Sequence, residues 1–145
     1  MCCEYQKFNG LVVLILQLLL IIILNMIIVS EDNFQDYSKT LKNLDAPIAD
    51  RTNALFCLRT LCTPECIKTL IDAFRSEPTS DLLRHEICYC LGQMNKDEEL
   101  TELIFGFLWK LLEEGVHEDK HAKVVIHEAV EALANMGREE SRKVL

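Results

Sequence analysis

Three eleven-residue segments of this 145-residue chain repeat one apolar pattern. They read RTNALFCLRTL (51–61), RHEICYCLGQM (84–94) and IHEAVEALANM (126–136). Within each segment the apolar residues recur three or four positions apart, which is the spacing of one face of an α-helix. No two-residue alternation, which would be typical of a half-buried strand, competes with this pattern. The pattern therefore predicts an all-α fold.

The segments start at positions 51, 84 and 126, so they are 33 and 42 residues apart. A second apolar helix is predicted in each interval, at 64–76 and at 97–114. Pro64 suits the first turn of a helix, and Gly137 suits a helix end. A period of this size with two helices in each unit predicts a superhelix of HEAT-like helical hairpins.

The first 30 residues differ from the rest of the chain. Residues 11–29 form an uncharged apolar run, about as long as a helix that crosses a bilayer. A membrane anchor, a cleaved signal peptide and extra sequence from an incorrectly joined gene start are the three interpretations of this segment. Because the composition becomes charged and amphipathic after Ser30, we predict a hydrophobic segment at 1–30 and a helical-repeat domain at 31–145.

Charge and cysteine content narrow the function classes. The formal net charge is −8 and the pI is about 5.0, which argues against a nucleic-acid-binding surface. The seven cysteines are an odd number, and the inner ones lie in predicted helices, so we expect reduced core residues. A zinc ion or a disulfide shared by Cys62 and Cys66 is the less favoured alternative.

Two of the three repeated segments carry a His-Glu pair near the start of the predicted helix, His85-Glu86 and His127-Glu128. Matching positions of successive repeats become neighbours in a stack, so we expect His85 and His127 to approach each other. Imidazoles and carboxylates together suit iron or manganese and, less selectively, zinc. The alternative is that the glutamates are ordinary N-terminal helix acids and the histidines their solvated neighbours.

A competing motif, His117-Glu118-x-x-His121, has the residue order of zinc peptidases. That chemistry needs both histidines on one face of a helix. Here the segment follows Gly115 and falls where the repeat alignment predicts a connection. We therefore expect a solvated loop and keep a zinc peptidase as a minor alternative.

The segments LLRHEICYCLGQM (82–94) and VVIHEAVEALANMG (124–137) resemble the paired His-Glu motifs of the deoxyhypusine hydroxylases, which are HEAT-repeat di-iron monooxygenases. The segment at 51–61 resembles the repeat that precedes those motifs in the family. The resemblance runs from about Phe34 to the C-terminus. It implies an enzyme that uses O₂ to hydroxylate the deoxyhypusine side chain of translation initiation factor 5A, which completes hypusine in the cytoplasm.

Carried over by position, the resemblance implies a metal site at His85, Glu86, His127 and Glu128, with Fe(2+) as the cofactor and two ions in each complete site. It implies no catalytic residue beyond these ligands. The family uses four His-Glu pairs from two halves, and this sequence resembles the N-terminal half only. We therefore expect a truncated form, a site shared by two self-associating chains, or an inactive chain. The alternative from another class is a noncatalytic HEAT-repeat protein-binding module, membrane-tethered if residues 11–29 are an anchor.

Overall fold

The computed structural model describes residues 29–94, 98–118 and 121–137, and every regular element in these ranges is helical. The chain divides into two compact units, Met1–Asp32 and Asn33–Leu145. A short 3₁₀ helix, η1, spans Glu31–Asn33. The six α-helices are α2 (Phe34–Lys42), α3 (Ile48–Leu61), α4 (Pro64–Ser76), α5 (Asp81–Gly92), α6 (Glu98–Glu118) and α7 (Lys123–Asn135).

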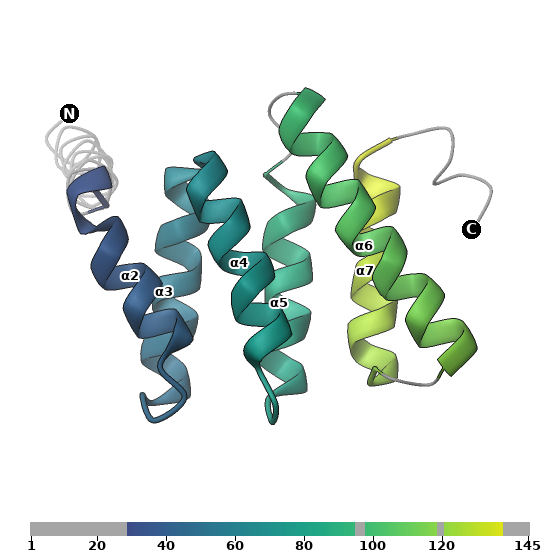
Figure 1. Cartoon of the computed structure of the whole chain (residues 1–145), viewed down its shortest axis with the longest axis horizontal. Helices are drawn as coiled ribbons and strands as arrows, with labels where there is room; N and C mark the ends of the chain where they lie inside the picture. Colours follow the sequence, from purple (N-terminus) through teal and green to yellow (C-terminus); the bar gives the residue numbers. More distant parts are fainter. Residues whose placement is uncertain (1–28, 95–97, 119–120, 138–145) are drawn as a thin grey trace, which may run out of the picture. The chain divides into compact units, whose positions relative to one another are not determined.

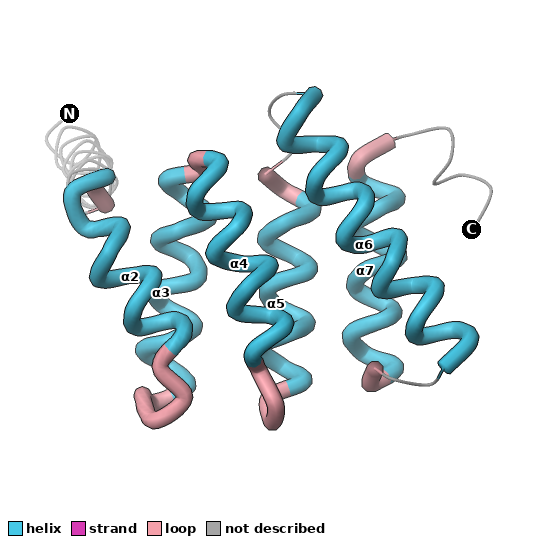
Figure 2. The backbone as a smooth tube through the Cα atoms, in the orientation of Figure 1, coloured by secondary structure: helices cyan, strands magenta, loops and turns pink. Residues whose placement is uncertain are grey.

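The all-α prediction is confirmed, and the helices pair in chain order. Helix α2 packs on α3, α4 on α5, and α6 on α7. Helices α3, α5 and α7, which contain the three repeated segments, contact one another in succession and form one layer. Helices α2, α4 and α6 form the second layer, in front of the first in Figure 1. The described connections lie at the ends of the helices (Figure 2), so helix surfaces form both faces of this unit.

The helix boundaries follow local signals where these are strong. Helix α4 has the predicted bounds, because the Thr63 hydroxyl accepts a hydrogen bond from the Cys66 backbone N–H at 3.3 Å and Pro64 occupies the first helical position. Gly137 follows α7 with a φ of +69°, in the left-handed region that favours glycine at a helix end. Helix α6 is longer than predicted and continues to Glu118.

The apolar positions of the repeats form the core between the two layers. Leu55, Leu58, Ile87 and Leu91 are fully buried, and Leu133 is nearly so. The side chains of α2, α4 and α6 complete this core, with Leu41, Leu70 and Leu108 among those fully buried. Each helix of the first layer therefore buries the face on which the sequence places its recurring apolar residues.

A buried ion pair that sequence analysis missed joins three parts of this unit. Arg51 in α3 donates from Nε to the Leu41 carbonyl at 2.9 Å and from its terminal nitrogen to Glu77 Oε2 at 2.5 Å. Glu77 Oε1 accepts from the backbone N–H groups of Thr79 and Ser80, both at 2.9 Å. This clamp connects the end of α2, the first turn of α3 and the start of α5, because Ser80 is the N-cap of α5.

The hydrophobic run at 11–29 lies almost entirely outside the described residues, so the anchor, signal-peptide and gene-start interpretations stay predictions. Within the described ranges, none of the helices combines the length and the apolar character needed to cross a membrane.

Candidate functional site

Helices α5 and α7 approach closely, and this contact positions the two His-Glu pairs. A Cβ atom on Gly92 would lie 2.7 Å from the Cβ and 2.9 Å from the Cα of Ala132, closer than side chains pack. Only a residue without a side chain fits here. The α5 and α7 backbones therefore come into direct contact, as neighbouring repeats should, but Gly92 meets Ala132 and not Ala134, its match in the repeat alignment.

Both His-Glu pairs occupy the same register, the fifth and sixth residues of α5 and α7. Thr52 and Asn53 are the fifth and sixth residues of α3, so the alignment of the three repeats holds in the structure. Both pairs lie beyond the first helical turn, because α5 begins at Asp81 and α7 at Lys123. Since the field of a helix terminus falls off beyond its first turn, it acts only weakly on either pair.

The contact between the two pairs joins His85 to Glu128. His85 Nε2 lies 3.1 Å from Glu128 Oε2, and His85 Nδ1 lies 3.4 Å from Glu86 Oε1. The His127 side chain is 70% exposed and lies 3.6 Å from Glu131 on its own helix. One histidine and two carboxylates therefore form the cluster, with the second histidine at its rim.

Glu128 has the most perturbed electrostatics in this cluster. Burial raises the pKa of its carboxyl group, the nearby His85 and His127 oppose that shift, and the negative charges of Glu131 and Glu86 add to it. Glu128 is buried although it is an acid, and His85 Nε2 lies 3.1 Å from its carboxylate. A carboxylate in such a position needs a cation or a proton to offset the cost of its burial.

The donor set of this cluster fits a hard or borderline metal ion. His85 Nδ1 is buried and, among the described residues, has no hydrogen-bond partner. An imidazole with an uncommitted ring nitrogen and two carboxylates suits iron or manganese better than a thiolate-preferring metal. Although His85, Glu86 and Glu128 lie close together, no three histidine, cysteine, aspartate or glutamate side chains in the part of the chain that the structure describes are placed so that they could hold a metal ion as they stand.

The cysteines in the described ranges are all free thiols. Burial, and secondly the negative charge of Glu128, raise the pKa of Cys88 well above its usual range. Burial likewise raises the pKa of Cys90 to about 12. Both thiols are fully buried, so they are packing residues, as the sequence predicted.

The competing zinc-peptidase motif does not lie on one helix. Helix α6 ends at Glu118, and His121 lies in the connection before α7. The predicted loop is therefore partly wrong, because His117 and Glu118 continue α6. The side chains of His117 and Glu118 lie outside the described part, whereas His121 Nε2 lies 3.4 Å from Glu114 Oε2.

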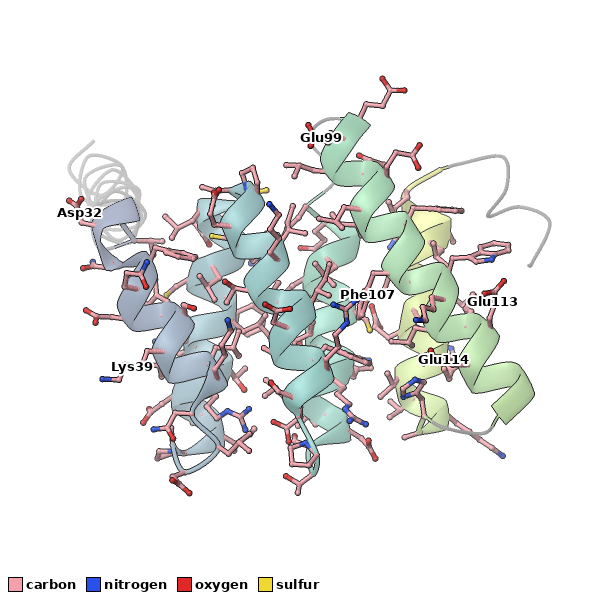
Figure 3. The ribbon with its side chains drawn as sticks, in the orientation of Figure 1. Asp32, Lys39, Glu99, Phe107, Glu113 and Glu114 are labelled. Carbon is pink, nitrogen blue, oxygen red and sulfur yellow. The ribbon has the colours of Figure 1, made fainter. Side chains whose placement is uncertain are left out.

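A second polar cluster, which sequence analysis missed, lines a cavity of about 260 Å³ on the α4–α6 side of α5. Arg84, the residue before His85, contributes to it, and Figure 3 shows Phe107 and Glu114 on α6. One feature of the sequence could have indicated this cluster: Arg84 aligns with Arg51 in the repeats. Because Arg51 is buried against a carboxylate, Arg84 was a candidate for binding a carboxylate as well.

Comparison with known proteins gives one consistent answer. No family model matches the chain. It is 43% identical over 79 residues to a protein from Dictyostelium discoideum, 34% over 110 residues to one from Rattus norvegicus, and 32% over 117 residues to one from Homo sapiens. All of these relatives are deoxyhypusine hydroxylases. The resemblance predicted from the His-Glu motifs is confirmed.

The fold agrees with this relationship. The structure of human deoxyhypusine hydroxylase in complex with glycerol matches 83% of this chain with a TM-score of 0.65 and 31% identity. The alignments cover 54%, 75% and 81% of this chain but only 24%, 32% and 35% of the Dictyostelium, rat and human enzymes. The chain thus spans between a quarter and about a third of the length of the deoxyhypusine hydroxylases it matches.

Proposed function

We propose that residues 31–145 form a HEAT-like repeat domain that supplies part of the metal site of a deoxyhypusine hydroxylase. The proposed reaction is the O₂-dependent hydroxylation of the deoxyhypusine side chain of translation initiation factor 5A. The relatives named for this activity support it, since most of the chain aligns with them. The observation that carries it is the 3.1 Å contact between His85 Nε2 and Glu128 Oε2, in which two pairs that are far apart in sequence share one cluster.

In this proposal His85, Glu86, His127 and Glu128 are iron ligands, and two ions occupy each complete site. Further ligands come from outside this chain, either from additional sequence or from a second copy. When bound, the iron would supply the activation of O₂. The role of the protein is to hold the ligands in position, and we propose no catalytic residue apart from them.

The side chains of this cluster differ in how firmly they are held. Glu128 is buried in the α5–α7 contact, so its carboxylate is fixed before any metal binds. His85 is three-quarters buried and rests on that carboxylate. His127, which is mostly exposed, can change rotamer to reach a metal beside them. Preorganised buried ligands with one adaptable member lower the cost of binding an ion.

The charge of the chain also supports an amine-bearing substrate. A formal net charge of −8 attracts a polyamine-like cationic side chain and accelerates its encounter with the site.

Metal analysis of the full chain tests this proposal. We expect bound iron in the wild type, and its loss in His85→Ala and in His127→Ala. His121→Ala is the matched control, because His121 also lies near a glutamate but contacts neither pair. Iron retained by both pair variants would refute the ligand assignment. A folded, helical wild type without iron would favour the noncatalytic binding module, and zinc lost specifically in His121→Ala would favour the peptidase.

A further inference from the structure

The cavity on the α4–α6 side of α5 has aromatic walls and a cationic lining. Phe74 and Phe107 line it and contact each other edge to face, with ring centroids 5.2 Å apart. Arg75, Arg84 and Lys110 contribute three positive charges to its lining, and Glu114 contributes one negative charge. With His121 neutral, the lining carries a formal charge of +2 (three minus one), whereas the whole chain carries −8. This cavity is therefore an electropositive exception on an acidic protein.

Two hydrogen-bonding groups at this cavity lack protein partners. Arg84 Nε and His121 Nδ1 are both buried, and neither has a hydrogen-bond partner within the described ranges. The Arg84 guanidinium stacks over the Phe74 ring at 5.4 Å, and its nearest carboxylate, Asp81, lies 4.0 Å away. A buried N–H of an arginine without an acceptor is costly, so its presence indicates an acceptor that binds from outside.

The chain itself shows what kind of acceptor suits this position. Arg51 and Arg84 are the fourth residues of α3 and α5, so they are equivalent in the repeat. Arg51 donates to the carboxylate of Glu77, which comes from the connection that follows α4. No such carboxylate reaches Arg84 Nε in the described part of the next repeat. A carboxylate ligand would complete for Arg84 the pairing that Glu77 completes for Arg51.

We propose that this cavity binds a small organic carboxylate with an apolar body. The carboxylate accepts hydrogen bonds from Arg84 with help from Arg75 and Lys110, and the apolar body packs against the Phe74 and Phe107 rings. Arg84 stacks on Phe74 of α4, whereas His85 contacts Glu128 of α7, so this site and the His-Glu cluster lie on different faces of α5, about 100° apart. It is independent of the proposed hydroxylase function.

Titration of the full chain with benzoate, followed by NMR, tests the proposal. We expect saturable binding at concentrations up to about 10 mM, with a shift of the Arg84 Nε–H signal as that group gains an acceptor. Benzamide has the same shape without the charge and should bind at least about tenfold more weakly. Inorganic phosphate has the charge without the apolar body and should also be the weaker ligand.

Substitutions assign the binding to this cavity. Arg84→Met should weaken benzoate binding about tenfold or more, since a charged hydrogen bond is lost. The double variant Arg75→Met/Lys110→Met should also weaken benzoate binding. The two side chains are 64% and 72% exposed, so replacing them should leave the fold intact. Glu114→Gln should tighten binding, because it removes the one negative charge. Lys39→Met removes an exposed lysine on α2 and should have no effect.

Several results would overturn this assignment. Benzoate that fails to saturate means that the cavity takes no such ligand. Equal binding of benzamide, or binding of phosphate in preference to benzoate, contradicts the ligand chemistry. A Lys39→Met variant that weakens binding as much as the double variant shows that net charge, and not the cavity, attracts the ligand.

Discussion

The buried Arg51–Glu77 clamp offers the most quantitative test of how this unit is held together. Arg51 is 4% exposed and Glu77 is fully buried. Glu77→Gln keeps the shape of the side chain but leaves the buried guanidinium without its counter-charge. Breaking a buried ion pair from one side costs about 3–5 kcal/mol, and a domain is typically stable by only about 5–15 kcal/mol. We expect Glu77→Gln to lose a large fraction of the total free energy of unfolding.

Urea unfolding of the full chain, followed by far-ultraviolet circular dichroism, measures this loss. The matched control is Asp72→Asn, which likewise removes an ion-paired acid. Asp72 lies 4.0 Å from Lys42 and 3.9 Å from Arg75. That aspartate is 60% exposed, so its ion pairs contribute at most about 1 kcal/mol. Should Glu77→Gln cost no more than Asp72→Asn, the reasoning from burial would be refuted.

The same carboxylate makes stability depend on pH. Burial alone would raise the pKa of Glu77, but the backbone N–H groups of Thr79 and Ser80 and the Arg51 guanidinium outweigh burial and hold it below the ordinary 4.5. Its stabilising contribution is therefore complete above that ordinary value and is lost as the pH falls through the lower folded-state pKa. The stability difference between wild type and Glu77→Gln should shrink as the pH falls from above 4.5 through that lower pKa. A constant difference would contradict the assigned ionisation.

Two further predictions concern packing and thiol reactivity. Gly92→Ala should destabilise the fold by about 1–3 kcal/mol, because the added Cβ meets the backbone of Ala132. The control, Gly106→Ala on α6, places its Cβ in open space and should stabilise the fold by up to about 1 kcal/mol. Equal effects of the two variants in thermal unfolding would contradict the close approach of α5 and α7. Cys88 and Cys90 are fully buried and have raised pKa values, so iodoacetamide should label them only after the chain unfolds. Mass spectrometry detects the label. Rapid labelling of the native chain would mean that these thiols lie at the surface.

The fold was predictable where the signals are local. The Thr63-Pro64 start of α4 and the three-to-four spacing of the repeated segments need only neighbouring residues, and both gave the observed helices. Helix α6 extends beyond its predicted end because an isolated Gly115 only weakens a helix and does not stop it. The Arg51–Glu77 clamp joins residues 26 positions apart, and no local pattern indicates which arginine is buried.

The candidate site was predictable in register but not in contact. The repeat alignment placed both His-Glu pairs at equivalent positions of neighbouring helices, which is a consequence of periodicity. The partner of His85 is Glu128, a residue one position further along α7 than the expected His127. A step of one residue rotates a helix position by about 100°, so the choice depends on how α5 and α7 face each other. Sequence periodicity alone does not set that angle.

Two consecutive positions of the repeated helix face different neighbours, and this separates the two proposed sites. At the fourth position, Arg84 stacks on Phe74 of α4, while at the fifth, His85 contacts Glu128 of α7. In α3 the equivalent residues are Arg51 and Thr52. Arg51 donates a hydrogen bond to Glu77 of the same chain, and the Thr52 hydroxyl donates to the Ile48 carbonyl at 2.8 Å. Register thus fixes where a side chain goes, and residue type fixes its chemistry.

Because Arg84 and His85 contact different neighbouring helices of α5, their substitutions should be separable. We expect His85→Ala to change metal content without changing benzoate affinity, and Arg84→Met to do the reverse, with the double variant showing the sum of both effects. Metal analysis and benzoate titration of the same three samples provide the measurement. Loss of both properties in either single variant, with helicity retained, would mean that α5 couples the two faces. The repeat register would then not be enough to explain how the chemistry is divided between them.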